Sequence, residues 1–303
     1  MDLTQYPNVR IVDEILRKKF PYFLGTLSKQ YTDFGDEWLS FFETDLESSF
    51  GNDATRLERA IQGYGAFALA SMRLQIKFQE TREYKSKTYE EAANEVYQNR
   101  DYMFNLYLPG IYLSHFLWRH HYRQYVFYKK EFIPLVQDHG GPLFYDIGVG
   151  TGFYSKEMLR INTEIRGQGF DLSPFSLEYT DMMLSARNLA NRYTGTLQDI
   201  ITEPVQTPAP FIINIEVLEH LENPQAFLNA LYHMLEPGGY GLISAAINAP
   251  NADHIYLYRK PRDVIDQIES AGFHLVNYVV DEAYEPRTPG ELVPVNAAFI
   301  VTR

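Results

Sequence analysis

The stretch "FYDIGVGTGFYSKEML", residues 144–159, places three glycines directly behind an apolar run that ends in an acidic residue. The run predicts a buried strand ending at Asp146, and Gly148, Gly150 and Gly152 predict the turn into a following helix. Glycine permits positive φ in such a turn and lets the backbone approach a ligand closely. A tight turn alone would account for one or two of these glycines, so the third favours a ligand-binding loop.

Two common phosphate-binding loops do not fit this stretch. A dinucleotide fingerprint needs glycine at position 153, where the chain has Phe153. A P-loop ends in Gly-Lys-Ser/Thr, whereas the nearest lysine, Lys156, lies in "YSKE". The loop therefore belongs to neither class.

The rest of the carboxyl half alternates between β-rich and helical runs. We expect strands within residues 142–149, 164–172, 191–199, 211–217, 240–248, 273–280 and 296–303. One helix is expected to begin with Ser173 as N-cap and Pro174 in its first turn, and another, within "NPQAFLNALYHMLEPGG", is expected to end at its glycines. Such alternation predicts a parallel sheet with helices on both faces. The last two strands have no helix between them and should pair antiparallel.

The amino-terminal half has a helical pattern throughout. Asp53 begins a run that carries one apolar face, comprising Leu57, Ile61, Tyr64, Ala68 and Met72. Thr88 and Glu91 form a capping box that begins another helix, which we expect "LPG" at 108–110 to end. The composition changes at 138–142, so we predict a helical region over 1–138 and an α/β domain over 139–303.

Bulk composition narrows the classes of partner. The 303 residues carry a net charge of −12, include no cysteine and contain no apolar run long enough to cross a bilayer. An acidic chain is poorly suited to binding nucleic acid or anionic lipid. We therefore expect a small-molecule partner, no nucleic-acid or membrane partner, and a cytoplasmic location.

Four features in order resemble the class I methyltransferases that use S-adenosylmethionine. "YDIGVGTG" is similar to motif I of that family, and Asp171, 19 residues beyond Gly152, stands where the family has the carboxylate that holds the ribose hydroxyls. Asp199, in "TLQDI", stands where an acidic residue meets the adenine. The segment 211–244, with its "LEH" and "PGG" turns, resembles the fourth and fifth motifs.

The resemblance implies a Rossmann-like α/β fold with a seven-stranded, mostly parallel sheet whose last strand is antiparallel, preceded by an all-helical region. It implies S-adenosylmethionine as cofactor and S-adenosylhomocysteine as product. The cofactor contacts that it implies are Tyr145, Asp146, Gly148, Gly150, Gly152, Asp171, Leu172, Asp199, Ile200, Ile215 and Glu216.

Methyl transfer from a sulfonium is an in-line displacement, so positioning supplies most of the catalysis and a base helps only where the acceptor loses a proton. The candidate bases are Glu216 and His220, which follow the fourth strand, and His121. Packing of the loop is the alternative role for His220.

Aromatic and imidazole side chains in 107–130 and 248–261 are candidates for an acceptor pocket. They are Tyr107, His115, Trp118, Tyr122, His254 and Tyr256. Helical spacing puts His115, Trp118 and Tyr122 on one face. Packing of an amphipathic helix against the sheet is the alternative for each residue.

The sequence therefore predicts a methyltransferase for a small, aromatic or partly apolar acceptor, with carbon or oxygen favoured over nitrogen. The helical region would form a lid or a homodimer surface. We expect no metal, because no pair of histidines has a known ligand spacing and adjacent histidines such as His120 and His121 should point apart. The alternatives are a metal-assisted 2-keto acid C-methyltransferase and a non-catalytic binding or regulatory protein that retains the fold.

Overall fold

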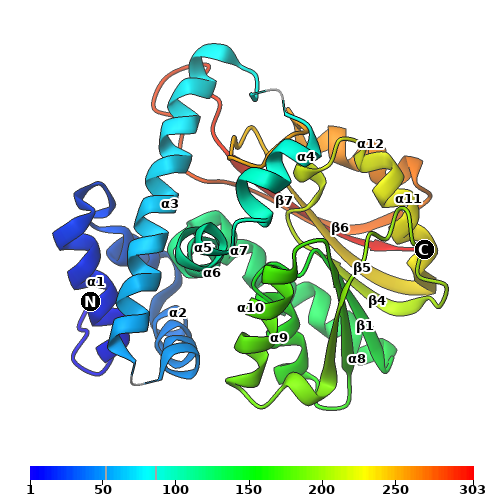
Figure 1. Cartoon of the computed structure of the whole chain (residues 1–303), viewed down its shortest axis with the longest axis horizontal. Coiled ribbons are helices and arrows are strands. Elements are labelled where there is room, and N and C mark those ends of the chain that lie inside the picture. Colours follow the sequence, from blue (N-terminus) through cyan, green and yellow to red (C-terminus); the bar gives the residue numbers. More distant parts are fainter. Residues whose placement is uncertain (52, 86) are drawn as a thin grey trace.

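The computed structural model describes residues 1–51, 53–85 and 87–303, and Figure 1 shows a helical part beside a twisted sheet. The helices of the amino-terminal part are α1 (Pro7–Lys19), α2 (Thr26–Phe50), α3 (Ala54–Thr81), α4 (Tyr89–Ala92), α5 (Arg100–Tyr102), α6 (Leu108–Leu117), α7 (Arg119–Phe127) and α8 (Ile133–His139), with π-helical turns at Ala93–Tyr97, Met103–Tyr107 and Tyr128–Phe132. The last of these helices ends four residues before the first strand begins.

The carboxyl half alternates between strands and helices. Its elements are β1 (Leu143–Ile147), α9 (Phe153–Ile161), β2 (Arg166–Asp171), α10 (Pro174–Ser185), β3 (Tyr193–Leu197), β4 (Ala209–Asn214), α11 (Pro224–Met234), β5 (Leu235–Ile247), α12 (Pro261–Ser270), β6 (His274–Glu282) and β7 (Val295–Thr302). Within the described residues, seven strands form one sheet in the order β3-β2-β1-β4-β5-β7-β6. β7 pairs antiparallel with β5 and β6, and the other pairs are parallel. The predicted sheet, including its antiparallel last strand, is confirmed.

The two faces of the sheet belong to different cores because side chains alternate along each strand. On β4, Phe211 and Ile213 join a core shared with α9, α10 and the amino-terminal helices. Ile212, between them, joins a second core under α11 and α12. The helical part therefore shares one continuous core with a face of the sheet.

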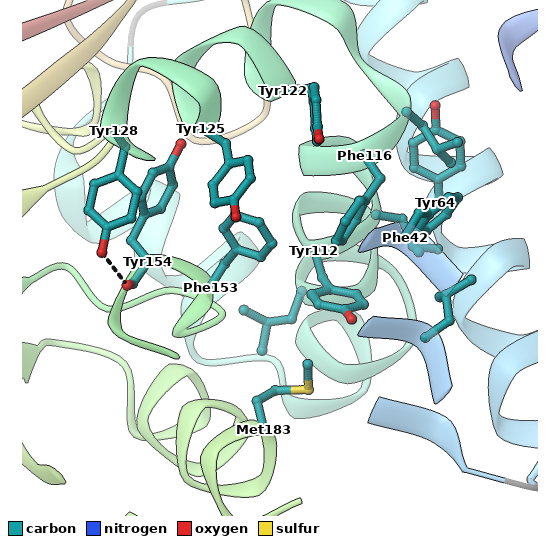
Figure 2. Close-up of a cluster of buried hydrophobic side chains, with 14 of the residues drawn as sticks. Phe42, Tyr64, Tyr112, Phe116, Tyr122, Tyr125, Tyr128, Phe153, Tyr154 and Met183 are labelled. Carbon is teal, nitrogen blue, oxygen red and sulfur yellow. Dashed lines mark hydrogen bonds between the residues drawn. The ribbon is translucent and has the colours of Figure 1, made fainter. Parts of the chain in front are cut away.

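Aromatic side chains fill the junction between the helical part and the sheet domain (Figure 2). Tyr125 of α7 stacks on Phe41 with ring centroids 5.0 Å apart and meets Phe153 of α9 edge-on at 5.4 Å. Tyr128 donates a hydrogen bond to the Tyr154 carbonyl at 3.1 Å. This packing fixes α7 against the helix that follows the glycine loop.

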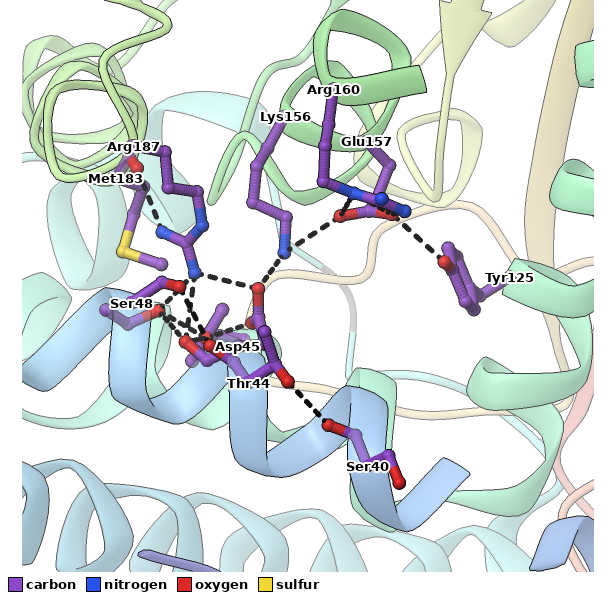
Figure 3. A network of polar contacts seen from close by, with 12 residues as sticks. Ser40, Thr44, Asp45, Ser48, Tyr125, Lys156, Glu157, Arg160, Met183 and Arg187 are labelled. Atoms are coloured by element: carbon purple, nitrogen blue, oxygen red, sulfur yellow. Dashed lines mark hydrogen bonds and ion pairs between the residues drawn. The ribbon is translucent and has the colours of Figure 1, made fainter. Parts of the chain in front are cut away.

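The helices at the junction are also joined by a buried ionic network, which Figure 3 shows. Asp45 of α2 pairs with Lys156 of α9 and, at 2.7 Å, with Arg187. Glu157 accepts hydrogen bonds from Arg160 at 2.7 Å and from Tyr125 at 3.0 Å. Asp45, Lys156 and Glu157 are almost completely buried, so these charges depend on one another.

Some of the local predictions for the helices were wrong. Asp53 caps α3 and the Thr88–Glu91 capping box is present, as expected. "LPG" ends no helix: Pro109 lies in the first turn of α6, where a missing N–H costs nothing. Met72 is 41% exposed to solvent, so it does not belong to the buried face of α3. Nor do the glycines end α11, which stops at Met234 where β5 begins.

Among the described residues, no helix combines the length and the apolar character needed to span a bilayer.

Candidate functional site

A cavity of about 1430 Å³ lies between the carboxyl ends of the strands and the amino-terminal helices. One part of its wall comes from the loops that follow β1 to β5, and the other from α3, α6, α7 and the turns before α6. A site for one small ligand typically occupies about 300–1,000 Å³. The cavity is therefore large enough for two ligands side by side.

The glycine loop forms one end of the cavity. Gly148 and Gly150 line it and take φ of +76° and +52°, values that strain any residue with a Cβ. Val217 Cγ2 would lie 2.5 Å from a Cβ at Gly148, so a side chain there would also clash. Glycine is thus required at both positions by the turn, and at Gly148 also by the close approach of Val217.

Two carboxylates face this loop. Asp146 is buried, accepts a 2.5 Å hydrogen bond from Ser155 Oγ, and has its pKa raised to about 7 by that burial. Asp171 accepts hydrogen bonds from the backbone N–H of Ser173 at 2.7 Å and of Gly150 at 3.4 Å. Burial raises the pKa of Asp171 to about 6. Both carboxyl groups are therefore poorly solvated, and a cationic or hydroxyl-bearing ligand would supply the partner that water does not.

Most of the residues predicted to contact the cofactor line this half of the cavity. They are Asp146, Gly148, Gly150, Asp171, Leu172, Asp199, Ile200, Ile215 and Glu216. Two predicted contacts do not. Tyr145 lies on the opposite face of β1, where its hydroxyl donates to the Thr207 carbonyl at 2.8 Å, because neighbouring strand residues point to opposite faces. Gly152 is the N-cap of α9, and a Cβ there would meet Thr180 at 2.7 Å, so it serves the turn.

A break in the helix at Trp118 shapes the other half of the cavity. Trp118 has φ −102° and ψ 124°, so α6 ends before it and α7 begins after it. His115, Trp118, His120 and His121 all line the cavity. Contrary to the prediction, His120 and His121 do not point apart: in the first turn of α7 their ring centroids lie 4.5 Å apart.

His121 and Glu216 meet across the cavity wall. His121 Nε2 lies 3.5 Å from Glu216 Oε2, and His121 Nδ1 lies 2.9 Å from Ser114 Oγ. Burial raises the pKa of Glu216 to about 7, and burial together with the neighbouring His120 and His115 lowers the pKa of His121 well below its usual value. Near neutral pH His121 is therefore neutral, while Glu216 is divided between its protonated and its ionised form. Glu216 also takes φ +54°, which is rare for a residue with a side chain.

Tyr122 and Tyr256 are corrections to the predicted acceptor pocket, because neither lines the cavity. Tyr122 points into the aromatic junction (Figure 2), with its ring 4.6 Å from that of Phe34. The break at Trp118 rotates Tyr122 away from the face that it would share with His115 in an unbroken helix. Tyr256 faces α12, where its hydroxyl accepts a hydrogen bond from Gln267 at 3.0 Å.

Three further residues from the predicted site line the cavity close to Asp253. They are Tyr107, His220 and His254. Tyr107 donates to Asp253 Oδ2 at 2.6 Å, and His220 Nδ1 lies 3.3 Å from the same oxygen. The His220 and His254 rings meet edge-on with centroids 4.7 Å apart. Burial lowers the pKa of His254 to about 3, so its imidazole is neutral.

Sequence reasoning missed several residues of this site. Tyr97 donates to Asp253 Oδ2 at 2.7 Å, and Phe153 stacks on His115 with centroids 4.3 Å apart. Glu219 is completely buried beside this part of the cavity. Its place in "EVLEH", directly before His220, was the signal available in the sequence.

The comparisons with known proteins agree with this geometry. Residues 145–240 match a family model described as a methyltransferase domain. The ubiquinone biosynthesis O-methyltransferase of Cereibacter sphaeroides (strain KD131) is 29% identical over 107 residues, which cover 35% of this chain and 42% of that protein. Its counterpart from Xylella fastidiosa (strain 9a5c) is 26% identical over 181 residues, which cover 52% of this chain and 70% of that protein.

The chain spans about two fifths of the length of the first two curated relatives it matches. A solved structure of PigF with SAH has a TM-score of 0.55 at 13% identity over 84% of this chain and 76% of that chain, a likeness in fold. The matched residues run from β1 into the first half of β5 and include the carboxyl ends of β1 to β4, which line one half of the cavity. The carboxyl half of the chain thus carries a methyltransferase domain with the Rossmann-like fold of the class I, S-adenosylmethionine-dependent methyltransferases.

Proposed function

We propose that the protein transfers a methyl group from S-adenosylmethionine to a hydroxyl oxygen of a small, aromatic or partly apolar molecule. The observation that carries this proposal is the single cavity of about 1430 Å³ that joins the glycine loop and its carboxylates to a wall of histidine and aromatic side chains. A cavity of this size accommodates the cofactor and the acceptor together, as direct transfer requires.

The cofactor would occupy the half formed by the strand ends. Asp171 would hold the ribose hydroxyls, and its orientation by the N–H groups of Ser173 and Gly150 supports that role. Asp146 would face the methionine ammonium, while Asp199 and Ile200 would flank the adenine. The positive charge of the bound cofactor would favour ionisation of Asp146 and Asp171, whose pKa values are raised by burial.

The acceptor would lie in the other half, against Trp118, His121 and Tyr107. In the transfer, the acceptor oxygen forms a bond to the methyl carbon as the carbon–sulfur bond breaks. The electron pair of that bond stays on sulfur, which leaves neutral S-adenosylhomocysteine. The acceptor proton passes to a base, and the methylated product leaves with the proton removed.

We assign the base role to His121. Ser114 Oγ donates its proton to the Ile111 carbonyl at 2.7 Å, so it can only accept a hydrogen bond from His121 Nδ1. This tautomer leaves the Nε2 lone pair of His121 toward Glu216. A hydroxyl placed beside both side chains could pass its proton to Nε2, and an ionised Glu216 would then stabilise the imidazolium.

Two further observations support the choice of acceptor. The curated relatives are named as O-methyltransferases of ubiquinone biosynthesis, which favours oxygen over carbon and nitrogen. The net charge of −12 disfavours a nucleic-acid acceptor. The amino-terminal helices would cover the acceptor and exclude water, and a homodimer through them remains a prediction.

Turnover tests the proposal. Purified protein is incubated with S-adenosylmethionine and a panel of phenols, catechols, 2-keto acids and amines, and S-adenosylhomocysteine release is measured. We expect release with hydroxylated aromatics, methylation at oxygen in the isolated product, and loss of both in Asp171→Ala. Methylation at carbon or nitrogen would contradict the assigned atom. Tight cofactor binding without turnover on any acceptor would favour a non-catalytic role.

A further inference from the structure

We propose that Glu219, His220 and His254 form a binding site for a divalent transition-metal ion in the wall of the cavity. One ligand atom from each residue lies within 4.8 Å of those of the other two. A cation bonded to all three at about 2.0–2.2 Å would bring these atoms to roughly 3–4 Å from one another. The ligand atoms would therefore have to approach one another by at most about 2 Å.

The backbone brings the three residues together from two loops. Glu219 and His220 lie in the turn after β4, and His254 lies in the loop after β5, which is the neighbouring parallel strand. The Glu219 carbonyl accepts hydrogen bonds from the N–H groups of Ile255 at 2.8 Å and Tyr256 at 2.9 Å. These bonds fix His254 beside the turn independently of any ligand.

Several polar atoms of this cluster lack hydrogen-bond partners among the described residues. Glu219 is 0% exposed, and neither of its carboxylate oxygens has a hydrogen-bond partner among the described residues. The same is true of His254 Nδ1, in a residue that is 8% exposed, and of Glu216 Oε1. Buried polar groups without partners are costly and rare. A cation would provide the missing partner for Glu219 and His254.

His220 has the support typical of a metal ligand. Tyr97 uses its only hydroxyl proton on Asp253 Oδ2, at 2.7 Å, so its oxygen accepts from His220 Nδ1 at 3.0 Å. Nδ1 therefore carries the proton, which leaves the Nε2 lone pair for a cation. Asp253, which is completely buried and lies 3.3 Å from Nδ1, provides the carboxylate that commonly orients a metal-bound histidine.

The donor set indicates the kind of metal. Two imidazoles with a carboxylate suit Mn²⁺, Fe²⁺, Co²⁺ or Zn²⁺ better than Mg²⁺, which prefers oxygen ligands. His220, His254 and Glu216 line the cavity, so the ion would be open to an acceptor there. The role of the ion in turnover rests on the proposed function: it would bind the acceptor oxygen and lower the pKa of the acceptor hydroxyl group. This proposal replaces the sequence-based expectation of no metal.

Cobalt titration tests the site directly. Tag-free, chelator-treated protein is titrated with Co²⁺ by visible absorption and with Zn²⁺ and Mn²⁺ by calorimetry. We expect one equivalent of metal and cobalt d–d bands of an imidazole–carboxylate site. Glu219→Gln and His254→Ala should each weaken binding at least about tenfold. His274→Ala, which removes an exposed histidine of β6, should bind as the wild type does.

The wild-type cobalt spectrum does not depend on whether the variants fold. Absence of binding in wild-type protein would overturn the proposal, as would unchanged affinity in folded Glu219→Gln and His254→Ala. The same chelated sample is titrated with S-adenosylhomocysteine. Cofactor binding without metal binding would refute the metal site alone, whereas metal binding without cofactor binding would refute the proposed function and leave the site standing.

Discussion

Lys156, in the helix that follows the glycine loop, forms a buried ion pair with Asp45 of α2 (Figure 3). Burial alone would raise the pKa of Asp45, but the charges of Lys156 and Arg187 outweigh it and hold that pKa below its usual value. In the sequence, Lys156 was the lysine nearest to the glycine loop, but its neighbours did not fit the P-loop pattern. In the structure, Lys156 joins the helical part to the sheet domain through its ion pair with Asp45.

Asp45→Asn should therefore destabilise the whole chain. The substitution removes the Asp45 carboxylate from two buried cations, of which Lys156 keeps Glu157 at 3.5 Å, and breaking a buried pair typically costs about 3–5 kcal/mol. We expect the free energy of unfolding, measured by urea titration, to fall by about that amount. The matched control is Lys129→Met, which breaks the exposed Lys129–Glu37 pair and should cost about 0–1 kcal/mol. Equal, small effects of both substitutions would show that the buried pair does not join the two parts.

The stability of the cofactor-free protein should decline as pH rises through neutrality because of Asp146. Burial raises its folded pKa from 3.8 to about 7, so the folded state favours the protonated form. The contribution of Asp146 to the free energy of unfolding is therefore complete below about pH 4 and is lost as the pH rises through about 7. Asn does not titrate, so Asp146→Asn removes this dependence. Relative to the wild type, the free energy of unfolding of the variant should therefore rise by up to about 4 kcal/mol between these two pH values.

Urea titrations at several pH values from 4 to 8 measure that difference. Asp181→Asn, at an exposed position of α10, serves as the control and should follow the wild type. Parallel pH profiles for wild type and Asp146→Asn would mean that Asp146 is not titrating in this range. Saturating cofactor should also flatten the wild-type profile, because the ligand charge compensates the carboxylate.

His121→Gln should lower kcat by about 10²–10⁴-fold if His121 is the base. Its affinity for S-adenosylhomocysteine should remain unchanged, because the predicted contacts of the cofactor lie at the strand ends. Tyr122→Phe is the matched control on the same helix and should retain wild-type kcat, since Tyr122 lies outside the cavity. A reduced kcat for Tyr122→Phe together with a normal kcat for His121→Gln would reverse our assignment of the two residues.

The sheet was predictable because its signals are local. Apolar runs such as "FIINIEV" and the glycine loop fix strand positions, and the absence of a helix between β6 and β7 fixes their antiparallel pairing. Caps at Asp53, Thr88 and Ser173 are equally local, since each side chain accepts from an N–H three residues ahead.

The acceptor half was less predictable because it depends on tertiary structure. Nothing local marks the break at Trp118, which moves His120 into the cavity wall and Tyr122 out of it. Glu219 and His254 come from separate loops, so only the folded chain brings them together. Spacing rules for an unbroken helix could not find either arrangement.

The measurement that tests the central claim most directly is calorimetric titration of wild-type protein and Asp171→Ala with S-adenosylhomocysteine. We predict saturable one-to-one binding to the wild type. Loss of one or two charge-assisted hydrogen bonds should weaken binding to Asp171→Ala by about 2–4 kcal/mol, or roughly 30- to 700-fold, with Asp181→Ala unchanged. Equal affinity in wild type and Asp171→Ala, or no binding to the wild type, would contradict a cofactor held at the glycine loop.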